Sequence, residues 1–162
     1  MNTKKLTRLS LLTALALIIF IVEAQLPPIA PIPGIKMGLA NIITLVALYM
    51  YGPKEAFTVL FLRIILGNMF SGQVSALMYS AAGGVFCFAV MCALYKILPR
   101  DLIWVVSVFG AIAHVTAQVF VAALITETPA VFWYLPLLLV SAVITGAFTG
   151  LCAYYCLKRW NK

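Results

Sequence analysis

The chain has 162 residues, of which 65% are hydrophobic and only 9% are charged. A water-soluble domain of this length could not bury so much apolar surface, and the composition therefore predicts a single integral membrane domain. Lysine and arginine outnumber aspartate and glutamate by 11 to 4, but they stand at the ends of apolar segments rather than on one basic face. This pattern indicates contact with the lipid bilayer and excludes a nucleic-acid-binding protein.

Six apolar segments approach the length of about 20 residues that a helix needs to cross a membrane. The first follows basic residues, as a secretory signal does, but no small-residue cleavage site closes it, and we interpret it as a retained helix. The Gly52-Pro53 pair separates the second segment from the third. We therefore expect an all-α bundle of six transmembrane helices at residues 6–25, 36–51, 54–70, 73–97, 102–126 and 130–158.

The basic residues are distributed unequally over the two sides of this predicted bundle. Only Lys36 falls on one side, and Arg63 lies within the membrane. The positive-inside rule then predicts that the N- and C-termini are both cytoplasmic. The residues on the cytoplasmic side are Lys4, Lys5, Arg8, Lys54, Lys96, Arg100, Lys158, Arg159 and Lys162.

A proline-rich segment, residues 27–34, follows the first predicted helix on the outer side. Proline fixes the backbone angle φ and removes a donor, so the segment should be extended and stiff. It is either a simple loop or a lid over an outward-facing cavity.

Arg63 interrupts an apolar stretch, residues 56–70, and a charge at membrane depth is costly. Three interpretations remain open. Glu23 or backbone carbonyl groups neutralise Arg63, its long side chain reaches the membrane surface, or it faces a ligand. In the last case the guanidinium suits a carboxylate or a phosphate group.

The other polar residues of the predicted helices concentrate in the outer half of the membrane, which favours an outward-facing binding cavity over a through-channel. His114 and Gln118 are four residues apart and share a helix face, and Lys36 lies at the rim. Hydrogen bonding within the bundle is an alternative role for His114 and Asn41. The candidate residues for binding a small polar or anionic ligand are Arg63, Asn41, His114, Gln118, Lys36, Gln73 and Glu23.

Small residues recur at a spacing of four in two predicted helices. Ser10 and Ala14 form one such pair, and Gly146 and Gly150 form the other. Both pairs permit close approach of a second helix, either for packing inside the bundle or for docking to another membrane protein. Gly83-Gly84 either kinks its helix or permits close packing.

The sequence contains few of the residue patterns that catalytic sites require. Asp101 is the only aspartate, and no phosphate loop, nucleophile elbow or cluster of metal ligands occurs. We expect no metal, no cofactor and no enzymatic activity of the chain alone. The four cysteines fall in the cytoplasmic halves of two helices, where free thiols are expected. They are Cys87, Cys92, Cys152 and Cys156.

Several stretches resemble a small bacterial family of Gx transporter proteins, which is also labelled heptaprenyl diphosphate synthase component I. The main one is IPGIKMGLANIITL at residues 32–45, and LRIILG (62–67), YSAAGG (79–84) and GAIAH (110–114) followed by Gln118 support it. The resemblance implies a multi-pass protein of the bacterial plasma membrane.

The resemblance has two functional implications. The family is similar in size to the substrate-binding S-components of energy-coupling factor (ECF) transporters, which implies ligand capture and an ECF energising module as a partner. The synthase label implies instead a prenyl synthase catalytic subunit as a partner. Such catalysts carry aspartate-rich motifs that this chain lacks, so its own role would be non-catalytic.

Overall fold

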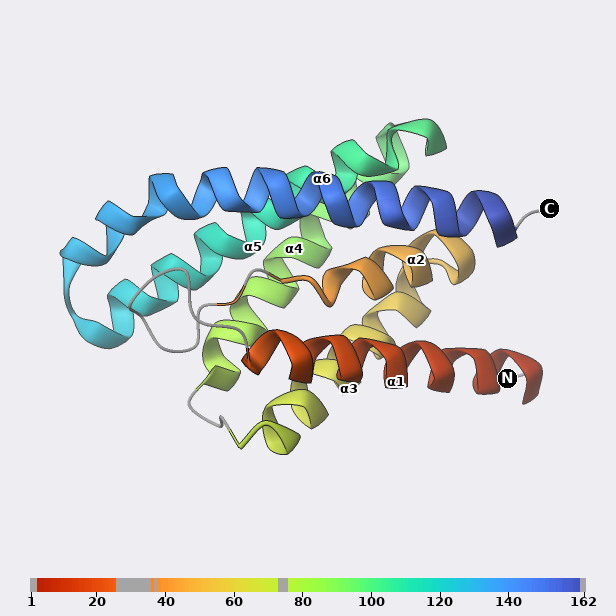
Figure 1. Ribbon diagram of the computed structural model, residues 1–162, viewed down its shortest axis with the longest axis horizontal. Coiled ribbons are helices and arrows are strands. Elements are labelled where there is room, and N and C mark those ends of the chain that lie inside the picture. Colours follow the sequence, from red (N-terminus) through yellow and green to blue (C-terminus); the bar gives the residue numbers. More distant parts are fainter. Residues whose placement is uncertain (1–2, 26–35, 37, 73–75, 161–162) are drawn as a thin grey trace.

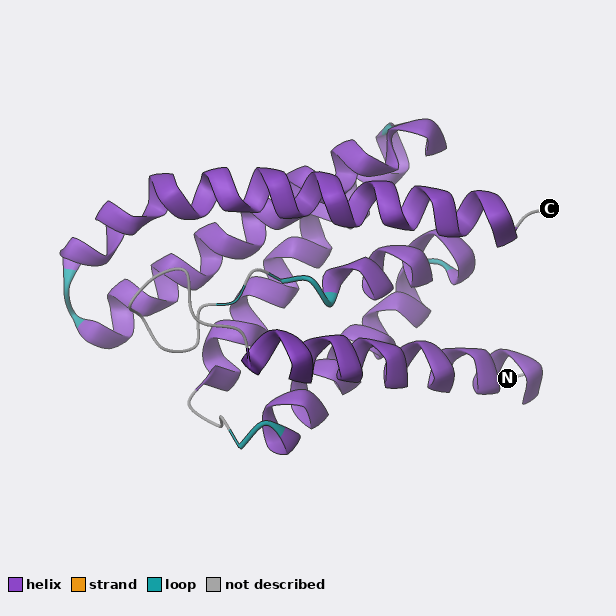
Figure 2. Cartoon of the chain, viewed as in Figure 1, coloured by secondary structure: helices purple, strands orange, loops and turns teal. Residues whose placement is uncertain are grey.

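The computed structural model describes residues 3–25, 36, 38–72 and 76–160, and this part of the chain is helical without any strand (Figures 1 and 2). The predicted all-α class is therefore confirmed. The elements are α1 (Thr3–Gln25), α2 (Asn41–Tyr51), α3 (Pro53–Phe70), α4 (Leu77–Ile97), the 3-10 helix η2 (Arg100–Leu102), α5 (Ile103–Thr126), the 3-10 helix η3 (Pro129–Tyr134) and α6 (Leu135–Trp160).

The turn between α2 and α3 forms at the predicted place. Gly52 has a φ of +94°, which glycine adopts without steric cost, and its N–H donates to Leu48 O at 3.0 Å. Pro53 then starts α3 at a position where no backbone donor is needed. The two helices consequently run in opposite directions from this turn.

Several predicted helix starts are wrong by a few residues. Helix α2 starts at Asn41 rather than at residue 36, because Gly38 has a left-handed φ of +80° and residues 39–40 form a turn. Helix α6 starts at Leu135 rather than at residue 130, because Pro129–Tyr134 forms the separate 3-10 helix. Helix α4 starts at Leu77 rather than at residue 73, and α1 already starts at Thr3.

Among the described residues, four helical segments are long and apolar enough to cross a membrane: Thr3–Gln25, Leu77–Ile97, Arg100–Thr126 and Pro129–Trp160. Their outer surfaces carry large exposed apolar side chains such as Phe86, Phe109 and Phe148, as expected of helices that face lipid. Helix α2 has only 11 residues, and α3 carries Lys54, Glu55 and Arg63 among its 18 residues. The structure is therefore that of a multi-pass membrane protein, and six spans remain a prediction.

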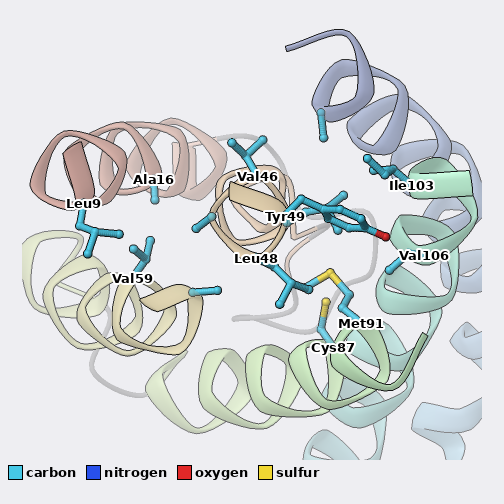
Figure 3. Close-up of a cluster of buried hydrophobic side chains, with 14 residues drawn as sticks. Leu9, Ala16, Val46, Leu48, Tyr49, Val59, Cys87, Met91, Ile103 and Val106 are labelled. Carbon is cyan, nitrogen blue, oxygen red and sulfur yellow. The ribbon is translucent and has the colours of Figure 1, made fainter. Parts of the chain in front are cut away.

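Helix α2 is the centre of the main hydrophobic core. Residues 44–49 of this helix are all buried, which suits a helix that is apolar on every side. Figure 3 shows α2 among the other helices, with Met91 of α4 and Val106 of α5 directed towards it, while Leu9 of α1 and Val59 of α3 face each other beside it. This arrangement places the first residue of α2, Asn41, between several helices.

Helices α5 and α6 pack with their backbones in close approach. A Cβ atom added at Gly146 would lie 2.8 Å from Val108 Cα, and one added at Gly150 would lie 2.5 Å from Trp104 Cα. The hydroxyl groups of Ser107 and Thr149 also form a hydrogen bond of 3.0 Å between these helices. Gly146 and Gly150 thus face the interior of the bundle rather than an external partner.

The start of α1 and the end of α6 lie at the same end of the molecule (Figure 1). The turn between α2 and α3 lies at this end too, and so does Lys54, the second residue of α3. Helices α1 and α3 both run away from this end. The basic residues that terminate these helices are therefore gathered at one end of the bundle, whereas the last turn of α1 and the first turn of α2 lie nearer its middle.

Candidate functional site

A cluster of buried polar side chains lies inside the bundle, away from the end that holds the helix-terminal basic residues. Glu23 stands in the last turn of α1, Asn41 starts α2, Arg63 lies on α3, and His114 and Gln118 lie on α5. Apart from the half-buried Asn41, each is at most 6% exposed. We call these residues together with Lys36 the polar cluster.

Arg63 contacts Asn41 rather than an acidic residue. Its Nη2 atom donates to Asn41 Oδ1 at 2.9 Å, while its Nε atom is buried and has no partner among the described residues. Glu23 and Arg63, both described, are not joined by an ion pair. A guanidinium group keeps its charge in proteins and has several further N–H donors, so this buried cation is incompletely satisfied by the described residues.

The contact continues from Asn41 to His114. Asn41 Nδ2 lies 3.4 Å from His114 Nδ1. Since an amide nitrogen only donates, this contact is a hydrogen bond in the tautomer whose Nδ1 carries no proton. His114 Nε2 is buried without a partner among the described residues. Polar contacts therefore connect Arg63 on α3, Asn41 on α2 and His114 on α5, and the last of these residues has a buried ring nitrogen without a partner among the described residues.

Two glycines make room for the His114 ring. A Cβ atom at Gly83 would lie 2.8 Å from His114 Cε1, and one at Gly38 would lie 3.1 Å from His114 Cδ2. Both distances are shorter than ordinary carbon–carbon contacts. Gly83 was recognised in the sequence only as a position for close packing, and Gly38 only as part of a family resemblance; neither was predicted to shape the site.

Glu23 binds the backbone that precedes α2. Its Oε1 atom accepts a hydrogen bond from Gly38 N at 2.5 Å. The carboxylate therefore ties the end of α1 to the left-handed turn before Asn41. In the described structure Glu23 thus binds a backbone N–H group rather than Arg63.

Lys36 lies close to two residues of the neighbouring helices. Its backbone N–H donates to Gln118 Oε1 at 3.3 Å, and its Nζ atom lies 3.8 Å from the centre of the Phe20 ring. Burial lowers the pKa of the Lys36 ammonium group, the charge of Glu23 opposes this shift, and the charge of Arg63 adds to it. The charges of Lys36, Glu23 and Arg63 are therefore close enough to influence one another.

The remaining predicted positions differ in what the structure shows of them. Gln73 and the proline-rich segment 27–34 lie outside the described residues. Ser10 and Ala14 are exposed and line a groove of about 400 Å³ between α1 and α3. Asn68, which was not among the predicted site residues, is also buried: its Nδ2 donates to Ile64 O of its own helix at 2.7 Å, and its Oδ1 has no partner among the described residues.

The polar cluster offers mainly hydrogen-bond donors to a bound molecule. Among the described residues, the buried atoms without a partner include Arg63 Nε, His114 Nε2 and Gln118 Nε2. Within the same part of the chain, no group of three or more histidine, cysteine, aspartate or glutamate residues could hold a metal ion. The four cysteines are free thiols. The chemistry available here is therefore recognition of acceptor groups.

Comparison with protein families gives a match over most of the chain. A family model described as heptaprenyl diphosphate synthase component I matches residues 12–156. This match covers every residue of the polar cluster. No curated protein matches the chain.

Proposed function

We propose that this chain, which belongs to the heptaprenyl diphosphate synthase component I family, captures a small polar or anionic ligand in the polar cluster and serves as the substrate-binding component of a transport system. In this role it is not an enzyme and needs no cofactor. It would act as a single domain in the bacterial plasma membrane, together with an energising partner such as an ECF module.

The observation that carries this proposal is the chain of contacts from Arg63 through Asn41 to His114. It places a permanent cation and several unpartnered donors in the interior of a membrane protein. Charged residues at such depth are expensive and are characteristic of binding sites and transport pathways. A ligand with acceptor groups would satisfy these donors.

The local charge favours an anionic ligand. Arg63 and Lys36 carry positive charge, and Glu23 is the acidic residue that acts on both. Glu23 is already bound to Gly38 N. A carboxylate or phosphate group would therefore meet a net positive site, and a guanidinium group binds either one with two parallel hydrogen bonds.

The direction of capture follows from the proposed topology. We infer six spans with both termini in the cytoplasm, because the start of α1 and the end of α6 share the end of the bundle that holds most basic residues. The polar cluster then lies to the outer side of the basic helix ends. A ligand would approach it from that side.

A second candidate function is a non-catalytic membrane subunit of a prenyl diphosphate synthase. The description of the matching family supports it. In that case a prenyl synthase catalytic subunit would be the partner and would supply the aspartate-rich metal site, since Asp101 is the only aspartate of this chain. The polar cluster would then hold an anionic group of a lipophilic substrate.

Native mass spectrometry of the gently purified protein tests ligand capture. We expect a retained small molecule in the wild-type protein, much less of it in Arg63→Gln, and partial retention in Arg63→Lys, which keeps the charge but not the planar fork. Lys96→Gln, at the other end of the molecule, is the control. A folded Arg63→Gln protein that retains the molecule at the wild-type level would refute the proposed site.

Co-purification separates the two functions. Recovery of an ATPase module with the tagged chain supports transport, whereas recovery of an aspartate-rich synthase subunit supports the second function. The mass of the retained molecule gives an independent answer, because a prenyl diphosphate carries a long hydrocarbon chain and a transported polar metabolite does not.

A further inference from the structure

A pocket lies at the end of the molecule that holds the start of α1 and the end of α6, away from the polar cluster. It has a volume of about 510 Å³ and lies between the start of α1, the end of α2, the η2 helix and the end of α6. This volume is typical of a small-molecule site. Its polar lining residues are Arg8, Tyr49, Tyr51, Arg100, Asp101 and Lys158, and we call it the basic pocket.

The charge of the basic pocket is positive. Three basic side chains, Arg8, Arg100 and Lys158, stand against the single carboxylate of Asp101, which leaves a net charge of +2. These three residues come from α1, η2 and α6. An anion bound in the pocket would thus lie near basic side chains from three separate elements.

Aromatic rings hold two of these cations beside the pocket. The Arg8 guanidinium lies 5.4 Å from the centre of the Trp160 ring, and Lys158 Nζ lies 5.8 Å from the centre of the Tyr154 ring. Both distances fall within the range of cation–π interactions. Such contacts restrict long side chains before a ligand arrives, which reduces the entropy lost on binding.

The hydroxyl group of Tyr49 provides an independent sign of a missing partner. Tyr49 lines the pocket and is only 7% exposed, and its hydroxyl has no hydrogen-bond partner among the described residues. Its ring packs edge-on against Tyr95 at 5.0 Å, and Figure 3 shows the hydroxyl directed towards Ile103 and Val106. The charge of Arg100 acts on this hydroxyl. A buried hydroxyl of this kind normally has a partner.

We propose that the basic pocket binds a phosphate group. A phosphate offers several acceptor oxygens and negative charge, which match guanidinium and ammonium donors and the Tyr49 hydroxyl. The pocket lies at the ends of helices that cross the membrane, where phospholipid headgroups are found. The phosphate belongs either to an anionic lipid headgroup or to a soluble phosphate compound. This proposal does not depend on the function of the polar cluster.

Binding to the full-length protein in detergent tests this proposal with three probes. Inorganic phosphate represents a soluble ligand, dioctanoyl-phosphatidylglycerol represents an anionic lipid, and dioctanoyl-phosphatidylcholine is the zwitterionic control. Titration calorimetry measures each affinity, and thermal unfolding checks that each variant is folded. The variants are Arg100→Gln and Lys158→Gln in the pocket, with Lys96→Gln as a basic control at the same end that does not line it.

We expect phosphatidylglycerol, inorganic phosphate or both to bind the wild-type protein more tightly than phosphatidylcholine. Arg100→Gln and Lys158→Gln should each weaken this binding about tenfold, the effect of losing a charge-assisted hydrogen bond. Lys96→Gln should leave the affinity unchanged. Binding of both probes identifies a general phosphate site, whereas binding of the lipid alone identifies a headgroup site.

Tyr49→Phe provides a further test, because it keeps the ring against Tyr95 and removes only the hydroxyl. A folded Tyr49→Phe protein should bind the phosphate probe several-fold more weakly. The proposal is overturned if neither phosphate probe binds better than phosphatidylcholine, or if the pocket variants bind as tightly as Lys96→Gln.

Discussion

Arg63 and Asn41, which lie on different helices, are joined by a hydrogen bond of 2.9 Å from Arg63 Nη2 to Asn41 Oδ1. The amide of Asn41 thereby connects a buried cation to His114 on a third helix. Asn41 therefore links α2 to α3 and α5, in addition to the apolar core contacts that α2 makes.

The Asn41→Ala variant should be clearly less stable than the wild-type protein. The substitution removes the partner of Arg63 Nη2 and leaves a buried charged donor unsatisfied, at a cost of about 1–3 kcal/mol or more. Thermal unfolding in detergent measures the change. Thr116→Ala is the control, since its exposed hydroxyl bonds only within α5. Equal midpoints for the two variants would contradict the importance of the Arg63–Asn41 contact.

The Glu23→Gln and Glu23→Ala variants should differ from each other. Glutamine keeps an oxygen that accepts the Gly38 N–H, so its stability should remain close to that of the wild-type protein. Alanine leaves this buried donor unpaired and should cost about 1–3 kcal/mol. Urea unfolding of the three proteins measures the difference. If glutamine destabilises as much as alanine, the charge of Glu23 matters more than its hydrogen bond.

The Gly83→Ala variant should be destabilised by about 1–3 kcal/mol, because the added methyl group overpacks the site around His114. The clash depends on the imidazole ring, so the double variant Gly83→Ala/His114→Ala should lose less stability than the two single effects combined. Thermal unfolding of the complete double-mutant cycle tests this coupling. Additive effects would mean that Gly83 does not act through His114.

The Gly150→Ala variant should weaken the packing of α6 on α5. The new methyl group would meet the Trp104 backbone, which cannot move as a flexible side chain can, and an overpacked interface typically costs about 1–3 kcal/mol. Phe148→Ala, on the outer surface of the same helix, is the control. Reduced thermal stability in both variants to the same extent would argue against this explanation.

The proposed topology predicts which residues are reachable from outside the cell. In a background without native cysteines, a membrane-impermeant thiol reagent should label Glu127→Cys in intact cells, because Glu127 lies between α5 and η3 at the outer end. Lys54→Cys should be labelled only after lysis. The reverse pattern would place both termini outside and the polar cluster on the cytoplasmic side.

Much of the fold could be predicted from local sequence features. The Gly52-Pro53 pair correctly marked the boundary between α2 and α3, and apolar runs located α1, α4, α5 and α6 to within a few residues. The start of α2 could not be predicted in this way. The apolar residues 39–40 look like part of the helix, but Gly38 has a left-handed φ and the helix begins only at Asn41. A backbone angle of this kind depends on what surrounds the glycine.

The candidate site was predictable as a group of residues but not as a set of contacts. Helical spacing brought His114 and Gln118 to one face, and membrane depth placed Arg63 and Asn41 near the same level. Nothing in the sequence indicated that Arg63 would bind Asn41, or that Glu23 would bind Gly38 N. Hydrogen bonds between helices depend on rotation and separation, which single-sequence periodicity does not specify.

The sequence by itself determined that this protein resides in a membrane, is helical and carries its basic residues mainly at one end, because composition and periodicity fix how each segment interacts with lipid. Only the tertiary structure decided which polar groups meet. It brought Arg63 to Asn41 in the polar cluster and Arg8 to Lys158 in the basic pocket. Residues so distant in the sequence become neighbours through the packing of whole helices, which no local pattern encodes.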